Sequence, residues 1–132
     1  GLRVTEQKGP APEQYVSLVT VEVETSQEKT IVSGTHMRGQ THIVRVSDYW
    51  IDIVPTGGYL LFTDLQDRPG MIGAVGTITG KHDINIGFME VGRMEARGRA
   101  TMILGLDDTL PEPVLAEINA LPNVLKTWVI QL

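Results

Sequence analysis

The segment YLLFTDLQDRPGMIGAVGTITGKHDINIGF, residues 59–88, changes its hydrophobic period twice and decides the fold of the second half of the chain. Residues 59–65 form an apolar run of the kind found in a buried strand. After a turn, four apolar residues at i, i+1, i+4 and i+7 predict a helix that ends near Lys81: Met71, Ile72, Val75 and Ile78. The next residues alternate again and predict a strand with three apolar side chains on one face: Ile84, Ile86 and Phe88.

The rest of the second half continues this exchange of strands and helices. A turn around residues 96–98 precedes a third strand at 100–106, and Pro111 opens a second helix that ends before Pro122. Residues 124–132 read as the last strand. The order β-α-β-β-α-β is the split βαβ arrangement of ferredoxin-like domains. We therefore predict an α+β fold with both helices on one face of a four-stranded antiparallel sheet.

The first half is expected to consist of strands without helices. Four stretches have the composition or alternation of strands: residues 18–25, 30–37, 42–46 and 50–54. We place the domain boundary at Gly57-Gly58, which gives domains at 1–58 and 59–132. A sheet with one apolar face needs a covering layer, from the second half, from a partner chain or from further residues of the same domain. Because the chain starts abruptly and without Met, we expect residues 1–58 to be the C-terminal portion of a larger domain.

Composition excludes several classes of protein. The 132 residues include 11 Lys or Arg and 16 Asp or Glu, and the net charge of −5 argues against a general nucleic-acid surface. The absence of cysteine excludes disulfides, Cys-ligated zinc and a thiol nucleophile. No apolar run approaches the roughly 20 residues of a membrane span, and no signal-peptide pattern is present. We expect a cytoplasmic protein without nucleic-acid or membrane partners.

No group of residues has the pattern of a catalytic or metal site. His36, His42 and His82 are scattered, and none has a neighbouring nucleophile or the spacing of a helical metal-binding pair. Gly70, Gly73 and Gly76 have threefold spacing in the predicted helix, which lets another element pack closely but does not make a phosphate loop. We expect no catalytic residues and no metal ligands here.

The turn from Asp67 to Gly70 is the one distinctive candidate site. It joins a strand to the start of a helix, where free N–H groups and the positive end of the helix dipole attract a carboxylate. Asp67 places a negative charge beside these donors, and Asn85 on the adjacent strand adds an amide. A ligand with both a carboxylate and an ammonium, an amino acid, matches this arrangement. The alternative is structural: Asp67 only caps the helix, with Pro69 in its first turn, and Asn85 only turns the chain.

Residues 59–132 resemble an ACT domain, the small-molecule-sensing module of amino-acid metabolism. The resemblance rests on Asp67-Arg68-Pro69-Gly70-Met71-Ile72-Gly73, followed after one helix by Asp83-Ile84-Asn85-Ile86. It extends to the helix length and the strand order. In ACT domains that pair side by side, the resemblance implies an effector site formed by Asp67, Arg68, Pro69, Gly70 and Met71, with Asn85 supplied across the interface.

The first half resembles the end of the intervening domain in the long-form D-3-phosphoglycerate dehydrogenase family. Three stretches carry this resemblance: Val32-Ser33-Gly34-Thr35, Ile43-Val44-Arg45-Val46 and Ile51-Asp52-Ile53. It implies the C-terminal regulatory part of an enzyme that oxidises 3-phosphoglycerate with NAD, the first step of serine synthesis. It further implies L-serine as a feedback effector, association into homo-oligomers through the ACT domains, and no cofactor in this fragment. Arg38 and Arg45 are candidates for binding an anionic effector.

Two other interpretations stay open. Family members that bind serine often carry His or Tyr two residues before the aspartate, whereas this chain has Leu65, which donates no hydrogen bond. The ACT domain would then serve assembly only. The other alternative is the regulatory part of an iron–sulfur L-serine dehydratase, and a chain without cysteine would be its cluster-free subunit.

Overall fold

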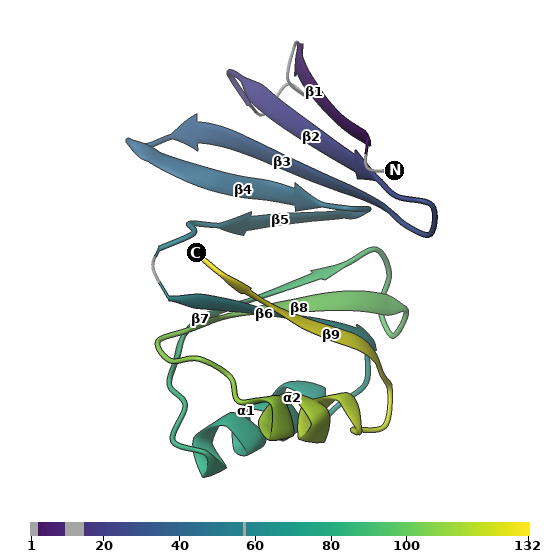
Figure 1. Cartoon of the computed structure of the whole chain (residues 1–132), viewed down its shortest axis with the longest axis vertical. Coiled ribbons are helices and arrows are strands. Elements are labelled where there is room, and N and C mark those ends of the chain that lie inside the picture. Colours follow the sequence, from purple (N-terminus) through teal and green to yellow (C-terminus); the bar gives the residue numbers. More distant parts are fainter. Residues whose placement is uncertain (1–2, 10–14, 57) are drawn as a thin grey trace. The chain divides into compact units, whose positions relative to one another are not determined.

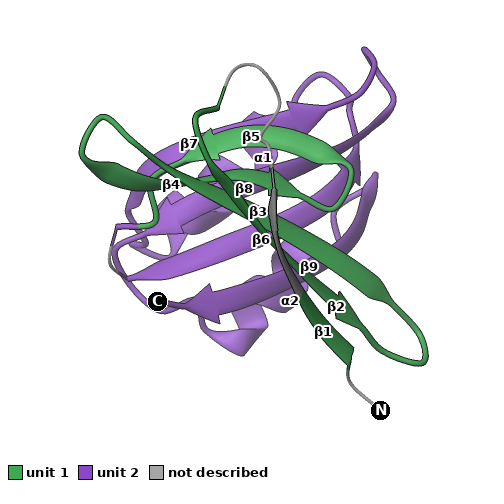
Figure 2. Cartoon of the chain, turned by 90° about the horizontal axis from the view of Figure 1, so that it is seen from above, with its two compact units in different colours: residues 1–55 green, residues 56–132 purple. Residues whose placement is uncertain are grey.

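The computed structural model describes residues 3–9, 15–56 and 58–132, with only the backbone of residues 6–9. The chain divides into two compact units, Gly1–Pro55 (unit 1) and Thr56–Leu132 (unit 2), coloured separately in Figure 2. This division lies close to the boundary predicted after Gly58. The assignment of residues 1–58 to an intervening domain stays a prediction.

Unit 1 contains a five-stranded antiparallel sheet in which the strands pair in sequence order, β1-β2-β3-β4-β5 (Figure 1). The strands are β1 (Arg3–Gly9), β2 (Leu18–Glu24), β3 (Lys29–Met37), β4 (Gln40–Val46) and β5 (Tyr49–Ile53). The sequence did not predict β1, because residues 3–9 lack an alternating apolar pattern. Pairing with β2, from Arg3 opposite Glu24 to Gly9 opposite Leu18, makes this segment a strand.

Turn chemistry and a bulge shape the sheet of unit 1. Arg38 and Gly39 join β3 to β4 with φ values of 53° and 78°, the left-handed pair that a two-residue hairpin needs. The register shifts at Ser33/Gly34, where a β-bulge bends β3. Arg45 donates from Nε to the carbonyl of Ser47 at 2.7 Å, so one of the two candidate anion ligands already has an internal partner.

Unit 2 has the predicted α+β, ferredoxin-like architecture. Its strands are β6 (Tyr59–Gln66), β7 (Ile86–Arg93), β8 (Arg99–Leu106) and β9 (Val124–Gln131), and its helices are α1 (Met71–Lys81) and α2 (Glu112–Asn119). The antiparallel sheet has the order β7-β8-β6-β9, and both helices cover one face of it (Figure 1). Core side chains from sheet and helices are almost fully buried between them: Leu61, Leu104, Val75, Val114 and Ile118.

Strand β7 differs from its prediction. It begins at Ile86 rather than at Ile84, extends to Arg93, and shifts register between Ile86 and Phe88. Ile86 lies opposite Leu106, whereas Phe88 lies opposite Gly105. Because Gly105 and Leu106 are consecutive in β8, they belong to opposite faces of the sheet, and so do Ile86 and Phe88. The prediction that Ile84, Ile86 and Phe88 share a face is therefore wrong, because one extra residue changes the alternation. A Cβ at Gly105 would lie 2.2 Å from the Phe88 ring, so this close packing requires glycine.

The two helices are linked at their exposed ends by a small ion-pair network. Glu117 of α2 accepts from Nζ of Lys81 at 3.3 Å and pairs with Nε2 of His82 at 2.9 Å. The hydrogen bond from His82, followed by that from Lys81, lowers the pKa of Glu117 below its ordinary value. These contacts connect the end of α1 to α2 without contributing to the core. In the described part of the chain, no helix is long and apolar enough to cross a membrane.

Candidate functional site

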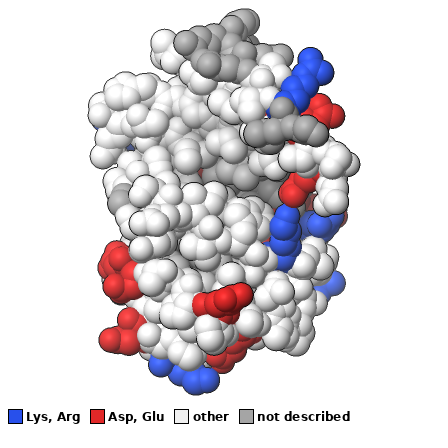
Figure 3. Space-filling model, in the orientation of Figure 1, with Lys and Arg blue, Asp and Glu red and all other residues white. Residues whose placement is uncertain are grey.

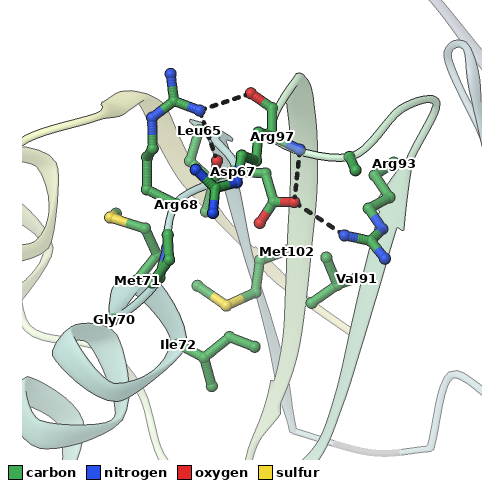
Figure 4. Close-up of a pocket in the computed structure, with 12 residues that line it drawn as sticks. Leu65, Asp67, Arg68, Gly70, Met71, Ile72, Val91, Arg93, Arg97 and Met102 are labelled. Carbon is green, nitrogen blue, oxygen red and sulfur yellow. Dashed lines mark hydrogen bonds and ion pairs between the residues drawn. The ribbon is translucent and has the colours of Figure 1, made fainter.

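A pocket of about 370 Å³ opens in unit 2 where β6 ends and α1 begins. The hairpin between β7 and β8 forms its other wall, because β6 pairs with β8 and brings Leu65 opposite Ala100. Figure 4 shows the charged side chains at one side of this pocket and the apolar side chains at the other. The turn, the helix start and the hairpin thus meet around one cavity.

The structure brings five of the six predicted effector residues to this pocket. Asp67, Arg68, Pro69, Gly70 and Met71 all line it. Asn85 lies just before Ile86, the first residue of β7, whereas the pocket is at the Arg93 end of that strand. Its Nδ2 donates to Oδ2 of Asp107 at 2.6 Å. Within one chain Asn85 therefore does not reach the pocket, and its role stays a prediction that depends on a second copy.

Asp67 faces the hairpin rather than capping α1. Its Oδ2 accepts hydrogen bonds from Nη1 of Arg93 at 3.1 Å and from the backbone N–H of Arg97 at 3.3 Å (Figure 4). The N-cap is Gly70, with φ 91° and no side-chain cap. The prediction that Asp67 caps the helix is therefore wrong, because Arg93 and Arg97 compete for its carboxylate. The first-turn N–H groups have no acceptor within the helix, and that of Met71 donates to the carbonyl of Arg68 at 3.3 Å.

The electrostatic environment keeps Asp67 negative. The hydrogen bond from Arg93 lowers the pKa of Asp67 below its ordinary value, and the backbone hydrogen bond from Arg97 lowers it further. Only one oxygen, Oδ2, accepts these two bonds. These two bonds leave the other oxygen, Oδ1, unused.

Three further hydrogen bonds hold the hairpin against the turn. The N–H of Asp67 donates to the carbonyl of Gly98 at 2.8 Å. Nη1 of Arg68 and Nε2 of Gln66 both donate to the carbonyl of Arg97, at 2.8 Å and 2.5 Å. Arg68 is therefore engaged with backbone oxygens and helps to hold the hairpin against the turn, while its predicted contact with an effector stays a prediction.

Sequence reasoning missed the residues that β7, β8 and the hairpin contribute. Arg93 and Arg97 supply charge, and Val91 and Met102 supply apolar surface. A signal for them was present, because the predicted turn at 96–98 and the ferredoxin-like order place the β7–β8 hairpin beside the end of β6. No period in the sequence, however, indicates which hairpin side chains turn inward.

In the described part of the chain, two histidines pair with carboxylates, but no cluster of metal ligands forms. Among those residues, no group of three or more His, Cys, Asp or Glu side chains is arranged to hold a metal ion. Nδ1 of His42 pairs with Asp52 at 2.6 Å, and His82 pairs with Glu117. On the face seen in Figure 3, the described basic and acidic side chains are dispersed, and no continuous basic patch is present there.

Comparison with known proteins assigns the class. The family model described as "ACT domain" matches residues 59–123. With the fold and pocket described above, unit 2 belongs to the ACT domain family.

The chain as a whole is similar to the C-terminal, ACT-containing region of D-3-phosphoglycerate dehydrogenases. The enzyme of Synechocystis sp. is 35% identical over 133 residues, which cover 100% of this chain and 24% of that relative. The enzyme of Methanocaldococcus jannaschii is 34% identical over 120 residues, 91% of this chain and 23% of that relative. The chain thus spans about a quarter of the length of these relatives.

A weaker similarity bears on the dehydratase alternative. A probable L-serine dehydratase β chain of Bacillus subtilis is 33% identical over 61 residues, 46% of this chain and 28% of that relative. The dehydrogenases match a larger share of the chain, so the dehydratase interpretation is not better supported.

Proposed function

We propose that this chain is the regulatory region of a D-3-phosphoglycerate dehydrogenase, that it binds an α-amino acid, and that it joins subunits. L-serine, the end product of serine biosynthesis, is the first candidate ligand. The observation that carries this proposal is the pocket that joins an ionised Asp67 to the start of α1 in an ACT domain. Oxidation of 3-phosphoglycerate with NAD belongs, in this proposal, to the full-length cytoplasmic enzyme.

The pocket can hold both charged groups of an amino acid. The first-turn N–H groups of α1 and the positive end of its dipole suit the α-carboxylate. Oδ1 of Asp67 suits the α-ammonium, while Arg93 holds Oδ2. Arg97 also lines the pocket and adds positive charge to it.

The same end of unit 2 suits association with a second copy. Strand β7 is at one edge of the sheet, and Met89 on it, Met94 after it and Ile72 of α1 are exposed apolar side chains. A Cβ added to Gly73 or Gly76 of α1 would meet nothing within 4 Å, so this helix face is open to close approach. In an antiparallel pair of β7 strands, the start of each strand lies beside the end of the other. Asn85 of a second copy would then approach Arg93 and the pocket.

Such a site couples ligand binding to subunit geometry. A ligand held between two ACT domains favours the arrangement that closes on it, and only a difference in affinity between two arrangements shifts their populations. Coupling energies of this kind are typically about 1–3 kcal/mol and act reciprocally on substrate binding. In this proposal, an active site elsewhere in the enzyme responds through domain orientation.

Calorimetry of the 132-residue chain with L-serine, combined with sedimentation equilibrium, tests the proposal. We expect saturable heat that is lost in Asp67→Asn and kept in Asp48→Asn, an exposed carboxylate in unit 1. A dimer that gives no heat with millimolar serine or any other α-amino acid, and whose Tm these ligands leave unchanged, would favour the assembly-only alternative.

A further inference from the structure

The pocket has an apolar half whose chemistry the proposed amino-acid function leaves unassigned. Leu65 of β6, Met71 of α1 and Met102 of β8 are buried hydrophobic side chains that line it, with exposed fractions of 3%, 7% and 1%. Val91 of β7 and the exposed Ile72 complete this surface (Figure 4). Four secondary-structure elements therefore contribute apolar atoms to one side of the cavity.

The polar groups of the pocket are all charged side chains or backbone groups. Among the described residues that line it within one copy, none carries a hydroxyl, an amide or an imidazole, and the amide of Asn85 would enter only from a second copy. The side chain of Asp67 holds Arg93, and Arg68 donates to the carbonyls of Asp67 and Arg97. What remains, Oδ1 of Asp67, the guanidinium of Arg97 and the helix N–H groups, suits the ammonium and carboxylate that every α-amino acid carries.

The ligand's side chain consequently meets the apolar half. A volume of about 370 Å³ is within the range of small-molecule pockets and leaves room for more than a hydroxymethyl group. A serine hydroxyl placed against Leu65, Val91 and Met102 would lose water without gaining a hydrogen-bond partner. An aliphatic side chain at the same place would bury apolar surface at no such cost.

We infer that this site selects α-amino acids with apolar side chains, such as L-valine, L-leucine or L-methionine, over L-serine. The inference rests on the proposed amino-acid site and specifies its ligand class. The residues that determine this specificity are Leu65, Val91 and Met102, and the charged rim binds the groups common to all amino acids. A preference of about tenfold or more is expected from one aliphatic group in an apolar pocket.

Calorimetric titration of the full chain with L-serine, L-valine and L-leucine tests the inference. Val91→Thr keeps the shape of the side chain and adds a hydroxyl to the pocket wall. Val129→Thr is the matched control, because Val129 packs against the same core from β9 without lining the pocket. 4-Methylpentanoate, which has the leucine side chain without the ammonium, tests whether binding needs the zwitterion. A thermal melt of each variant reports its folding.

The expected result is at least tenfold tighter binding of L-leucine or L-valine than of L-serine in the unmodified chain. Val91→Thr should reduce this ratio several-fold, Val129→Thr should leave it unchanged, and 4-methylpentanoate should bind weakly. Binding of L-serine as tight as that of the aliphatic amino acids would overturn the inference and leave the proposed function standing. Absence of heat with every amino acid would overturn the proposed function and the inference with it.

Discussion

Nη1 of Arg93 lies 3.1 Å from Oδ2 of Asp67, and this ion pair joins the last residue of β7 to the turn before α1. The side chain of Arg93 is exposed, at 56%, whereas that of Asp67 is partly buried, at 27%. Because the hairpin backbone also bonds to Asp67, the carboxylate links two walls of the pocket. Asp67 therefore has a structural role before any ligand arrives.

Removal of the guanidinium should be visible in the titration of the carboxylate. The hydrogen bond from Arg93 is the largest cause of the lowered pKa of Asp67, so Arg93→Gln should raise that pKa toward the ordinary value of 3.8. Carboxyl-carbon NMR of the Asp67 side chain across pH measures it. Arg99→Gln, on the same hairpin, is the control, and an equal shift in both variants would contradict the assignment.

The same ion pair gives a pH-dependent contribution to folding. Because the pKa of Asp67 is lower in the folded than in the unfolded chain, its ionised form stabilises the fold at pH values above 3.8. That contribution is lost as the pH falls through the lower, folded pKa. The Tm difference between the unmodified chain and Asp67→Asn should be largest near neutral pH and should shrink below about pH 4. A difference that stays constant from pH 7 to pH 3 would show that the charge plays no part.

Gly58 should tolerate no side chain. Its φ is 79°, and a Cβ there would lie 2.5 Å from the carbonyl oxygen of Leu106. Gly39 has a similar φ of 78° with nothing within 4 Å, so Gly39→Ala carries the conformational cost alone, about 1 kcal/mol. Gly58→Ala should cost about 1–3 kcal/mol more than Gly39→Ala in urea unfolding, because backbone must move. Equal losses would mean that the contact with Leu106 relaxes freely.

Gly73→Ala should have opposite effects on folding and on association. The space around Gly73 is open in the single chain, and alanine is a better helix former, so unfolding free energy should rise by about 0.5–1 kcal/mol. A second copy packed against this face would meet the new methyl group, and sedimentation equilibrium should show weaker self-association. Thr109→Ala, at an exposed position outside α1, is the control, because residues four apart such as Gly73 and Thr77 share one face of the helix. Unchanged association in Gly73→Ala would place the contact elsewhere.

The core of unit 2 should respond more strongly than its surface. Ile118 of α2 is fully buried, with 0% of its surface exposed, and Ile118→Ala should cost about 2–5 kcal/mol in denaturant unfolding. Leu125 on β9 is 52% exposed, and Leu125→Ala should cost less than about 1 kcal/mol. Similar losses at both positions would contradict the packing described here.

Helices and strands whose apolar residues recur at a regular spacing were predictable from the sequence. A strand that forms only because it pairs with its neighbour was not. The stripes of Met71, Val75 and Ile78 predicted α1, and the β-α-β-β-α-β order predicted the sheet. Strand β1 was missed because its hydrogen bonds to β2, and not its own composition, order its backbone. The bulge in β7 left no mark on the alternation of residues 84–88.

The pocket was predictable in part for a similar reason. The five consecutive residues 67–71 stood out, because a strand-to-helix turn places free N–H groups beside a carboxylate. The partner of Asp67 was not predictable, because Arg93 lies 26 residues away and reaches it through a hairpin. The neighbouring residues alone suggested that Asp67 caps α1, whereas in the structure its carboxylate pairs with Arg93.

The bulge between Ile86 and Phe88 has a consequence for protein engineering. Side chains before and after it are out of phase, so Ile86 faces the helices while Phe88 covers Gly105 on the other face. Deletion of Gly87 would restore plain alternation and keep this arrangement, whereas an unbulged strand that retained Gly87 would turn the phenylalanine ring toward the helices and leave Gly105 uncovered. Transplanting this sheet edge onto another scaffold consequently requires its residue count as well as its side chains. A sequence alignment with an unbulged strand needs a one-residue gap at this place. Without the gap, every later residue of the strand would be assigned to the wrong face of the sheet.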